Sequence, residues 1–239
     1  MSEAEGVAER LAGVRQRIAA AARRAGRRPE EVALLGVAKR QPAGRVVAAV
    51  RAGLEHVAEN YLQEALERRL EVQVALEGLG LDPPRWHFIG RLQRNKARRV
   101  AEAFDLVQTL DRPALGAELD RRAAATGRRL TVLLQVDLSG EPGKGGVAPE
   151  QAPALLAESL AWGHLDLAGL MAIPAPQPDP ELSRPDFARL RELLGALRRA
   201  PGGSGLRELS MGMSADFEVA VEEGATMVRV GTALFGPRG

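Results

Sequence analysis

Lysine is scarce in this chain, and the position of one lysine suggests chemistry. Of 33 basic residues only three are lysines, which leaves 30 arginines; the lysines are Lys39, Lys96 and Lys144. An amine can lose its proton and attack a carbonyl carbon, whereas a guanidinium group practically cannot. Lys39 follows a short apolar run, as expected at the carboxyl end of a buried strand. Burial there would lower the pKa of its amine, so Lys39 is a candidate to form a Schiff base with an aldehyde. A rim lysine paired with a carboxylate is the alternative.

Two loops near the C-terminus carry residue types that suit a phosphate group. The segments Ser210–Ser214 and Gly231–Thr232 each follow an apolar run and precede a helical pattern. Loops in these places, after the last two strands of an α/β barrel, bind phosphate through hydroxyl and backbone N–H donors. We therefore predict that both loops contact a phosphate, with ordinary turns as the alternative.

An arginine is predicted on the inward face of the last strand. Arg229 shares its face with Met227, while Val228 and Val230 occupy the opposite face. A buried arginine is costly unless it binds a partner, and an acidic neighbour on an adjacent strand is one alternative. Together, a strand-end amine, two phosphate-binding loops and a buried arginine suggest pyridoxal 5′-phosphate (PLP). Its aldehyde would bond to Lys39, and Arg229 would face the pyridine nitrogen.

A fold of alternating strands and helices has to position these residues. Eight apolar runs separated by helical patterns favour eight parallel βα units closed into a barrel, rather than an open sheet. Ser2 to about Arg27 has apolar residues at helical spacing and a capping box at Ser2 and Glu5. We therefore predict one domain, a single (β/α)8 barrel of residues 1–239, with an extra amphipathic helix over residues 1–27. Pro174–Pro185 and Gly140–Pro149 are predicted as long irregular loops. The predicted strands are Val32–Lys39, His56–Asn60, Trp86–Gly90, Leu106–Leu110, Leu130–Leu138, Leu165–Ile173, Leu206–Gly212 and Met227–Gly231.

Composition excludes several classes of protein. Hydrophobic residues at 45% and charged residues at 27% are typical of a globular chain. The absence of cysteine excludes disulfides, thiolate metal sites and a cysteine nucleophile. No apolar run is long enough to span a membrane, and the acidic N-terminus does not resemble a signal peptide, so we expect a cytoplasmic protein.

Other chemistries find little support in the sequence. His56, His87 and His164 lack the spacing of metal ligands and are expected to be core or rim residues. The basic stretch Arg91–Arg99 is expected to be a solvated helix face. With a net charge of +2 and only 3% aromatic residues, the chain offers few stacking platforms, which argues against a nucleic-acid partner.

Several motifs follow one another in the order of a known family. They run from about Val32 to Gly236 and resemble those of the pyridoxal phosphate homeostasis protein family, whose barrel is similar to the N-terminal domain of alanine racemase. The motifs are Gly-Val-Ala-Lys39, Glu59-Asn60-Tyr61, Trp86-His87-Phe88-Ile89-Gly90, Ser210-Met211-Gly212-Met213-Ser214 and Val228-Arg229-Val230-Gly231-Thr232.

The resemblance implies a protein that binds PLP without a demonstrated reaction and acts in vitamin B6 and amino-acid balance. It places the Schiff base on Lys39, Arg229 near the ring nitrogen and Asn60 in the cofactor pocket. It implies phosphate contacts at Ser210, Gly212, Gly231 and Thr232, with Met211 among the cofactor-binding residues. The chain departs from the family pattern where Ala38 and Arg40 flank the lysine, at Val57-Ala58 and at Asp137.

A PLP-dependent racemase is the rival interpretation. Two-base racemisation needs a second proton donor opposite the lysine, and the similar racemase supplies a tyrosine from a separate domain. Here the sole tyrosine is Tyr61, expected at a helix start, and the sequence ends at Gly239, soon after the eighth unit. We therefore expect a non-catalytic, monomeric carrier or buffer of PLP, with PLP-dependent apoenzymes as acceptors. A racemase-like enzyme is the alternative.

Overall fold

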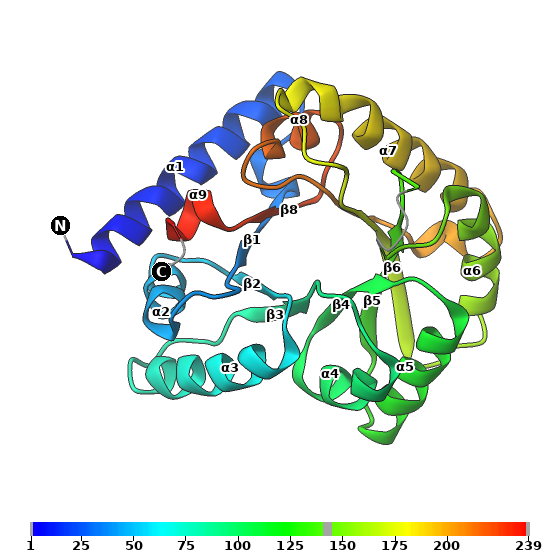
Figure 1. Ribbon diagram of the computed structural model, residues 1–239, viewed down its shortest axis with the longest axis horizontal. Coiled ribbons are helices and arrows are strands. Elements are labelled where there is room, and N and C mark those ends of the chain that lie inside the picture. Colours follow the sequence, from blue (N-terminus) through cyan, green and yellow to red (C-terminus); the bar gives the residue numbers. More distant parts are fainter. Residues whose placement is uncertain (1, 141–144, 238–239) are drawn as a thin grey trace.

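Eight parallel strands form a closed barrel. The computed structural model describes residues 2–140 and 145–237, so Lys144 and part of the predicted loop Gly140–Pro149 lie outside the described residues. Strand order follows chain order, and β8 pairs with β1 to close the ring (Figure 1). The predicted barrel is confirmed, and each predicted strand overlaps one observed strand. The strands are β1 (Ala33–Val37), β2 (His56–Glu59), β3 (Arg85–Phe88), β4 (Leu106–Leu110), β5 (Leu130–Val136), β6 (Leu165–Ala172), β7 (Glu208–Ser210) and β8 (Met227–Val230).

Helices surround this ring (Figure 1). Among the described residues, no helix has both the length and the apolar character needed to cross a lipid bilayer. The α-helices are α1 (Glu3–Arg24), α2 (Ala43–Arg51), α3 (Leu62–Glu77), α4 (Ala97–Ala103), α5 (Pro113–Ala125), α6 (Ala152–Ser159), α7 (Arg184–Arg198), α8 (Phe217–Glu222) and α9 (Thr232–Phe235). Short 3-10 helices are η1 (Pro29–Glu31), η2 (Arg94–Lys96), η3 (Pro149–Gln151), η4 (Pro180–Ser183) and η5 (Gly203–Gly205).

The extra N-terminal helix is confirmed, and it covers the place where the barrel closes. The predicted capping box is present, because the Ser2 hydroxyl accepts from the Glu5 N–H and the Glu5 carboxylate accepts from the Ser2 N–H. The Arg10 Nε donates to the carbonyl of Leu234 at 3.0 Å, and the Arg17 guanidinium donates to the carboxylate of Glu218 at 2.8 Å. The first helix is thereby fixed to the last two helices of the chain.

Part of the predicted proline-rich loop is helical. Residues 174–179 are irregular, but η4 begins at Pro180 and α7 begins at Arg184. The prediction that all of Pro174–Pro185 is irregular was therefore wrong. Proline fits the first turn of a helix, since the N–H it lacks has no partner there in any case.

Two apolar layers share the strands between them. One lies between the strands and the helices, and the other fills the barrel itself. Neighbouring strand residues can face different layers, as in β1, where Leu34 packs in the outer layer and Leu35 in the inner one. The inner layer consists of Leu35, Val37, Ala58, Ile89, Leu106, Leu133, Ala168, Met171 and Met227.

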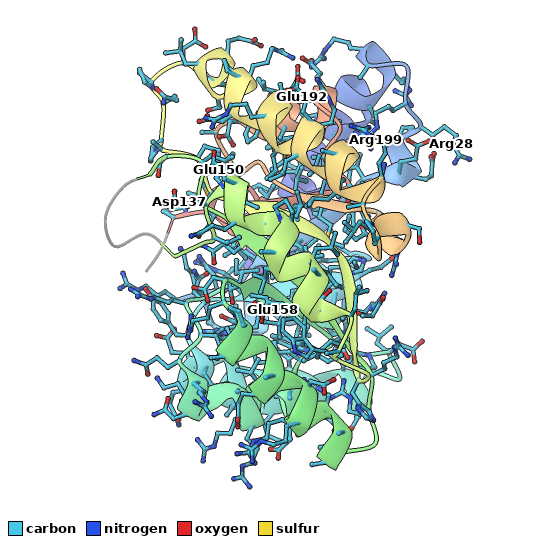
Figure 2. All side chains as sticks on the ribbon, turned by 90° about the vertical axis from the view of Figure 1, so that its right-hand side faces the viewer. Arg28, Asp137, Glu150, Glu158, Glu192 and Arg199 are labelled. Atoms are coloured by element: carbon cyan, nitrogen blue, oxygen red, sulfur yellow. The ribbon has the colours of Figure 1, made fainter. Side chains whose placement is uncertain are left out.

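The two ends of the barrel are distinct. In Figure 2, Asp137, which follows β5, lies on one side of the molecule, and Arg28, which precedes β1, lies on the other. The carboxyl ends of all eight strands meet on the Asp137 side because the strands are parallel. Binding sites of barrels of this kind lie at that end.

Candidate functional site

Lys39 lies where the sequence predicts, at the carboxyl end of β1. It occupies a turn two residues after the last strand residue, Val37, and its side chain is partly buried. The Gln41 N–H closes this turn by donating to the carbonyl of Ala38 at 2.9 Å. Arg40 has φ = 58°, the left-handed conformation that residues other than glycine rarely adopt. A sharp and strained turn therefore presents Lys39 at the mouth of the barrel.

A buried ion pair between α3 and the end of β2 is hydrogen-bonded to this turn. The Arg68 guanidinium on α3 contacts the carboxylate of Glu59, which is fully buried, and its Nε donates to the Gln41 carbonyl at 2.7 Å. Burial raises the pKa of the Glu59 carboxyl to about 7, although Arg68 acts in the opposite direction. Because Glu59 directly precedes Asn60, the pair joins the lysine turn to the predicted cofactor-pocket asparagine.

Asn60 has a polar atom that lacks a protein partner. Its Oδ1 is buried, and no described residue hydrogen-bonds to it. Asn60 lines a cavity of about 270 Å³ at the carboxyl ends of the strands. A buried amide oxygen without a partner costs free energy, and a ligand that donates to it would remove that cost. The remaining lining residues are Ile89, Gly90, Arg91, Gln135, Val136, Asp137, Gly145 and Ile173.

Arg229 is buried on the inner face of β8, as predicted. One guanidinium nitrogen donates to the Ser210 hydroxyl at 2.7 Å, and the other donates to the carbonyl of Ala172 at 2.8 Å. The alternative of a carboxylate partner is not found within the described residues, where Asp216 acts only at longer range. Burial lowers the pKa of Arg229 to about 10, so it is still a cation at neutral pH. Two of its five N–H groups are used, which leaves donors for a ligand.

The loop after β7 approaches α8 closely at Gly212. This residue has φ = 87°, and a Cβ placed there would come within 2.5 Å of the Ala220 Cβ. Met211, predicted among the cofactor-binding residues, is the neighbour of Gly212. Its side chain packs in the outer apolar layer, and its N–H donates to the carbonyl of Met227 at 3.1 Å. Only the carbonyl of Met211 is left for a ligand.

A serine joins the two predicted phosphate loops. The Ser214 hydroxyl accepts from the N–H of Gly231 at 3.2 Å and from the N–H of Ala233 at 3.4 Å. Thr232, between these two, is exposed at the start of α9. The structure thus brings the loops Ser210–Ser214 and Gly231–Thr232 together, and the Ser214 hydroxyl accepts from two N–H donors of the second loop and α9.

A row of buried polar groups inside the barrel was not predicted. His56 and His87 lie 3.0 Å apart between ring nitrogens, and Gln108 lies 3.2 Å from His87. Gln108 also accepts from the Ser210 hydroxyl at 2.6 Å. The one signal in the sequence was a glutamine within the apolar run Leu106–Leu110. The prediction of core histidines is confirmed for His87, and no group of possible metal ligands occurs within residues 2–140 and 145–237.

Two further predictions concern the mouth of the barrel. Tyr61 does lie at a helix start, as the residue that precedes α3, and its side chain is 46% exposed. The basic stretch Arg91–Arg99 runs through η2 into α4, and every basic side chain in it is exposed. The expected solvated face is therefore confirmed.

Taken together, the described residues fit PLP. Arg229 is a buried donor with neutral partners, suited to a ring nitrogen, and Asn60 has an unused oxygen at the same end of the barrel. Gly212 lets the loop after β7 pack closely against α8, because a Cβ there would meet Ala220 and Phe217. Lys39 supplies the amine. Of these residues, Asn60 alone lines the 270 Å³ cavity.

Known proteins are similar to this chain in sequence and in fold. The family described as "Alanine racemase, N-terminal domain" matches residues 10–239. The pyridoxal phosphate homeostasis protein of Pseudomonas aeruginosa is 47% identical over 232 residues, covering 97% of this chain and 96% of that protein. The Escherichia coli K12 protein of the same name is 40% identical over 239 residues, covering 97% of both chains.

Solved structures agree with this relationship. PipY of Synechococcus elongatus, determined with PLP bound, has a TM-score of 0.84 at 36% identity and covers 96% of this chain and 100% of that chain. An alanine racemase of Clostridium difficile has a TM-score of 0.67 at 17% identity, covering 85% of this chain and 54% of its own, which shows the fold alone. By sequence and by fold, this chain belongs to the pyridoxal phosphate homeostasis protein family.

Proposed function

We propose that this protein binds PLP at the carboxyl end of its barrel, holds it as a Schiff base on Lys39, and acts as a carrier or buffer in PLP homeostasis. The observation that carries the proposal is Arg229, a buried cation whose hydrogen-bond partners are neutral and which retains donors for a ligand. The names of the relatives and the PLP bound to PipY support the same cofactor. When bound, PLP supplies an electrophilic carbon attached to an electron-withdrawing ring.

Arg229 favours holding the cofactor over using it. With a pKa of about 10, its guanidinium stays protonated at neutral pH and donates to the ring nitrogen. A nitrogen that accepts this hydrogen bond is kept unprotonated, so the ring withdraws electrons weakly. Most chemistry of this cofactor depends on strong withdrawal, and the arginine therefore disfavours turnover.

The position of Tyr61 supports the same conclusion. Two-base racemisation needs a proton donor held against the substrate, on the side opposite the lysine. Tyr61 is the only tyrosine in the sequence, and its side chain is 46% exposed at the start of α3. We propose that the protein works in the cytoplasm as a monomer and passes PLP to apoenzymes. The absence of a membrane-spanning helix among the described residues supports this location.

Isotope exchange distinguishes a carrier from an enzyme. We expect the PLP-loaded protein, incubated with single L-amino acids in deuterated water, to incorporate no deuterium at Cα beyond one equivalent per protein, while it slowly passes PLP to an added apoenzyme. Catalytic incorporation of deuterium that Lys39→Ala abolishes would overturn the carrier proposal in favour of a racemase-like enzyme.

The phosphate loops predict a difference between two ligands. Thr232→Val removes a hydroxyl at the start of α9, and the loss of one hydrogen bond to a charged group costs roughly 1.5–3 kcal/mol. We therefore expect weaker binding of PLP and nearly unchanged binding of pyridoxal, which lacks the phosphate, as measured by titration. Equal losses for both ligands would show that Thr232 is merely structural.

A further inference from the structure

A continuous chain of side chains crosses the inside of the barrel. It runs from His56 through His87, Gln108 and Ser210 to Arg229, with successive separations of 3.0, 3.2, 2.6 and 2.7 Å. Its last four members are at most 3% exposed. The chain begins at the first residue of β2 and ends at the cofactor end of β8, so it connects the two ends of the barrel.

Arg229 fixes the direction of every hydrogen bond in this chain. A guanidinium can only donate, so the Ser210 hydroxyl accepts from it and gives its own proton to the Gln108 carbonyl oxygen. The Gln108 amide nitrogen then faces His87 and donates to its Nδ1. His87 therefore carries its proton on Nε2 and donates to the Nδ1 of His56.

The reverse arrangement leaves a buried donor without an acceptor. If the Gln108 amide were turned over, its nitrogen and Arg229 would both donate to Ser210. The hydroxyl proton of Ser210 would then have lost its acceptor in the barrel interior, at a cost of about 1–3 kcal/mol. Burial lowers the pKa of His87 to about 3, so its ring is neutral and has the one donor and one acceptor that the chain needs.

We propose that Ser210, Gln108 and His87 are positioning residues, which hold Arg229 toward the ring nitrogen of PLP and whose hydrogen-bond direction Arg229 sets. The proposal rests on the proposed function, because it takes PLP as the occupant of the site. It also assigns the Ser210 hydroxyl to the ring-nitrogen side. Its only proton goes to Gln108, so it has none to donate to the phosphate.

His56 connects this chain to the opposite face of the molecule. Its ring lines a cavity of about 660 Å³ at the N-terminal end of the barrel, which brings solvent to the first member of the chain. The other charged residues that line this cavity are Arg15, Arg23, Glu30 and Glu55.

The tautomer of His87 in the ligand-free protein tests the direction of the chain. Two-bond 1H–15N correlation spectra distinguish a proton on Nε2 from one on Nδ1. We expect His87 to be entirely the Nε2–H form in the wild type and in Thr109→Val. This control changes the neighbour of Gln108 on β4, whose buried hydroxyl hydrogen-bonds to no described residue. In Ser210→Ala, where Gln108 is free to turn over, we expect the Nδ1–H form to appear. A wild-type His87 protonated on Nδ1 would overturn the proposed direction.

Ligands that differ only at the ring nitrogen test the positioning role. Gln108→Leu cuts the chain, and we expect it to weaken binding of PLP by roughly tenfold or more, since tenfold is close to the lower limit for one hydrogen bond to a charged group. The 1-deaza analogue of PLP has carbon in place of the ring nitrogen, so the same variant should bind it as well as the wild type does.

The outcomes separate this inference from the proposed function. Equal losses of PLP and of the analogue in Gln108→Leu would overturn the positioning role, as would unchanged PLP binding. If that variant does not fold, Ser210→Ala takes its place with the same two ligands. A wild-type protein that binds no PLP would refute the proposed function, whereas the tautomer of His87 would still report on the chain.

Discussion

Reduction of the PLP-loaded protein with borohydride is expected to leave the pyridoxyl group on the peptide that contains Lys39. The amine lies on a strained turn at the mouth of the barrel, at the end where the fold places its sites. Lys39→Ala should lose the reducible adduct and its absorption band completely. The variant lacks the amine, and arginine side chains cannot form a Schiff base in its place. Peptide mapping by mass spectrometry gives the position of the adduct.

Lys96 is the matched control for this experiment. It is an exposed lysine of η2, so Lys96→Ala should keep the full adduct. An adduct on Lys96 or Lys144 in the wild-type protein would contradict the assignment of the Schiff base to Lys39.

The second large effect is expected at Gly90, where two strand ends meet. A Cβ on Gly90 would overlap the carbonyl oxygen of Asn60 and lie 2.7 Å from its carbonyl carbon. These are backbone atoms, so no side chain can turn away to relieve the overlap. We expect Gly90→Ala to lower the free energy of unfolding by about 3 kcal/mol or more, as judged by urea denaturation. It should also weaken PLP binding, because Asn60 has to move.

Gly44→Ala is the corresponding control on a helix. Gly44 lies in α2, and a Cβ there would have no atom within 4 Å. The same change of residue should raise the free energy of unfolding by up to about 1 kcal/mol, since alanine loses less backbone entropy in a helix than glycine does. Equal stability of wild type and Gly90→Ala would show that the ends of β2 and β3 are less tightly opposed than described.

The sequence predicts the barrel because its signal is repeated and local. The alternation of residues along β8 placed Arg229 inside and its neighbours Val228 and Val230 outside, and the structure confirms all three. The capping box is also a local signal, because it involves only Ser2 and Glu5, three residues apart. The helical start at Pro180 was missed because prolines break most helices but are accepted in the first turn, so they mark both a loop and a helix start.

The site could be predicted only where its residues end strands. Lys39 and Gly231 follow apolar runs, and a parallel barrel brings all such positions to one end. Hydrogen-bond partners on different strands could not be predicted in this way. Gln108 and Ser210 are 102 residues apart in the chain, and no periodicity within either strand reveals that their side chains meet at 2.6 Å.

By itself, then, the sequence determined the eight βα units, the scarcity of lysine that singles out Lys39, and the inward face on which Arg229 lies. Tertiary structure alone decided that Ser210 bonds Arg229 and Gln108, that His56 and His87 touch, and that Asn60 has an oxygen without a partner. The physical reason is the closure of the barrel. Patterns along a strand fix which way a side chain points, whereas the register and curvature of all eight strands fix which inward side chains come within hydrogen-bonding distance.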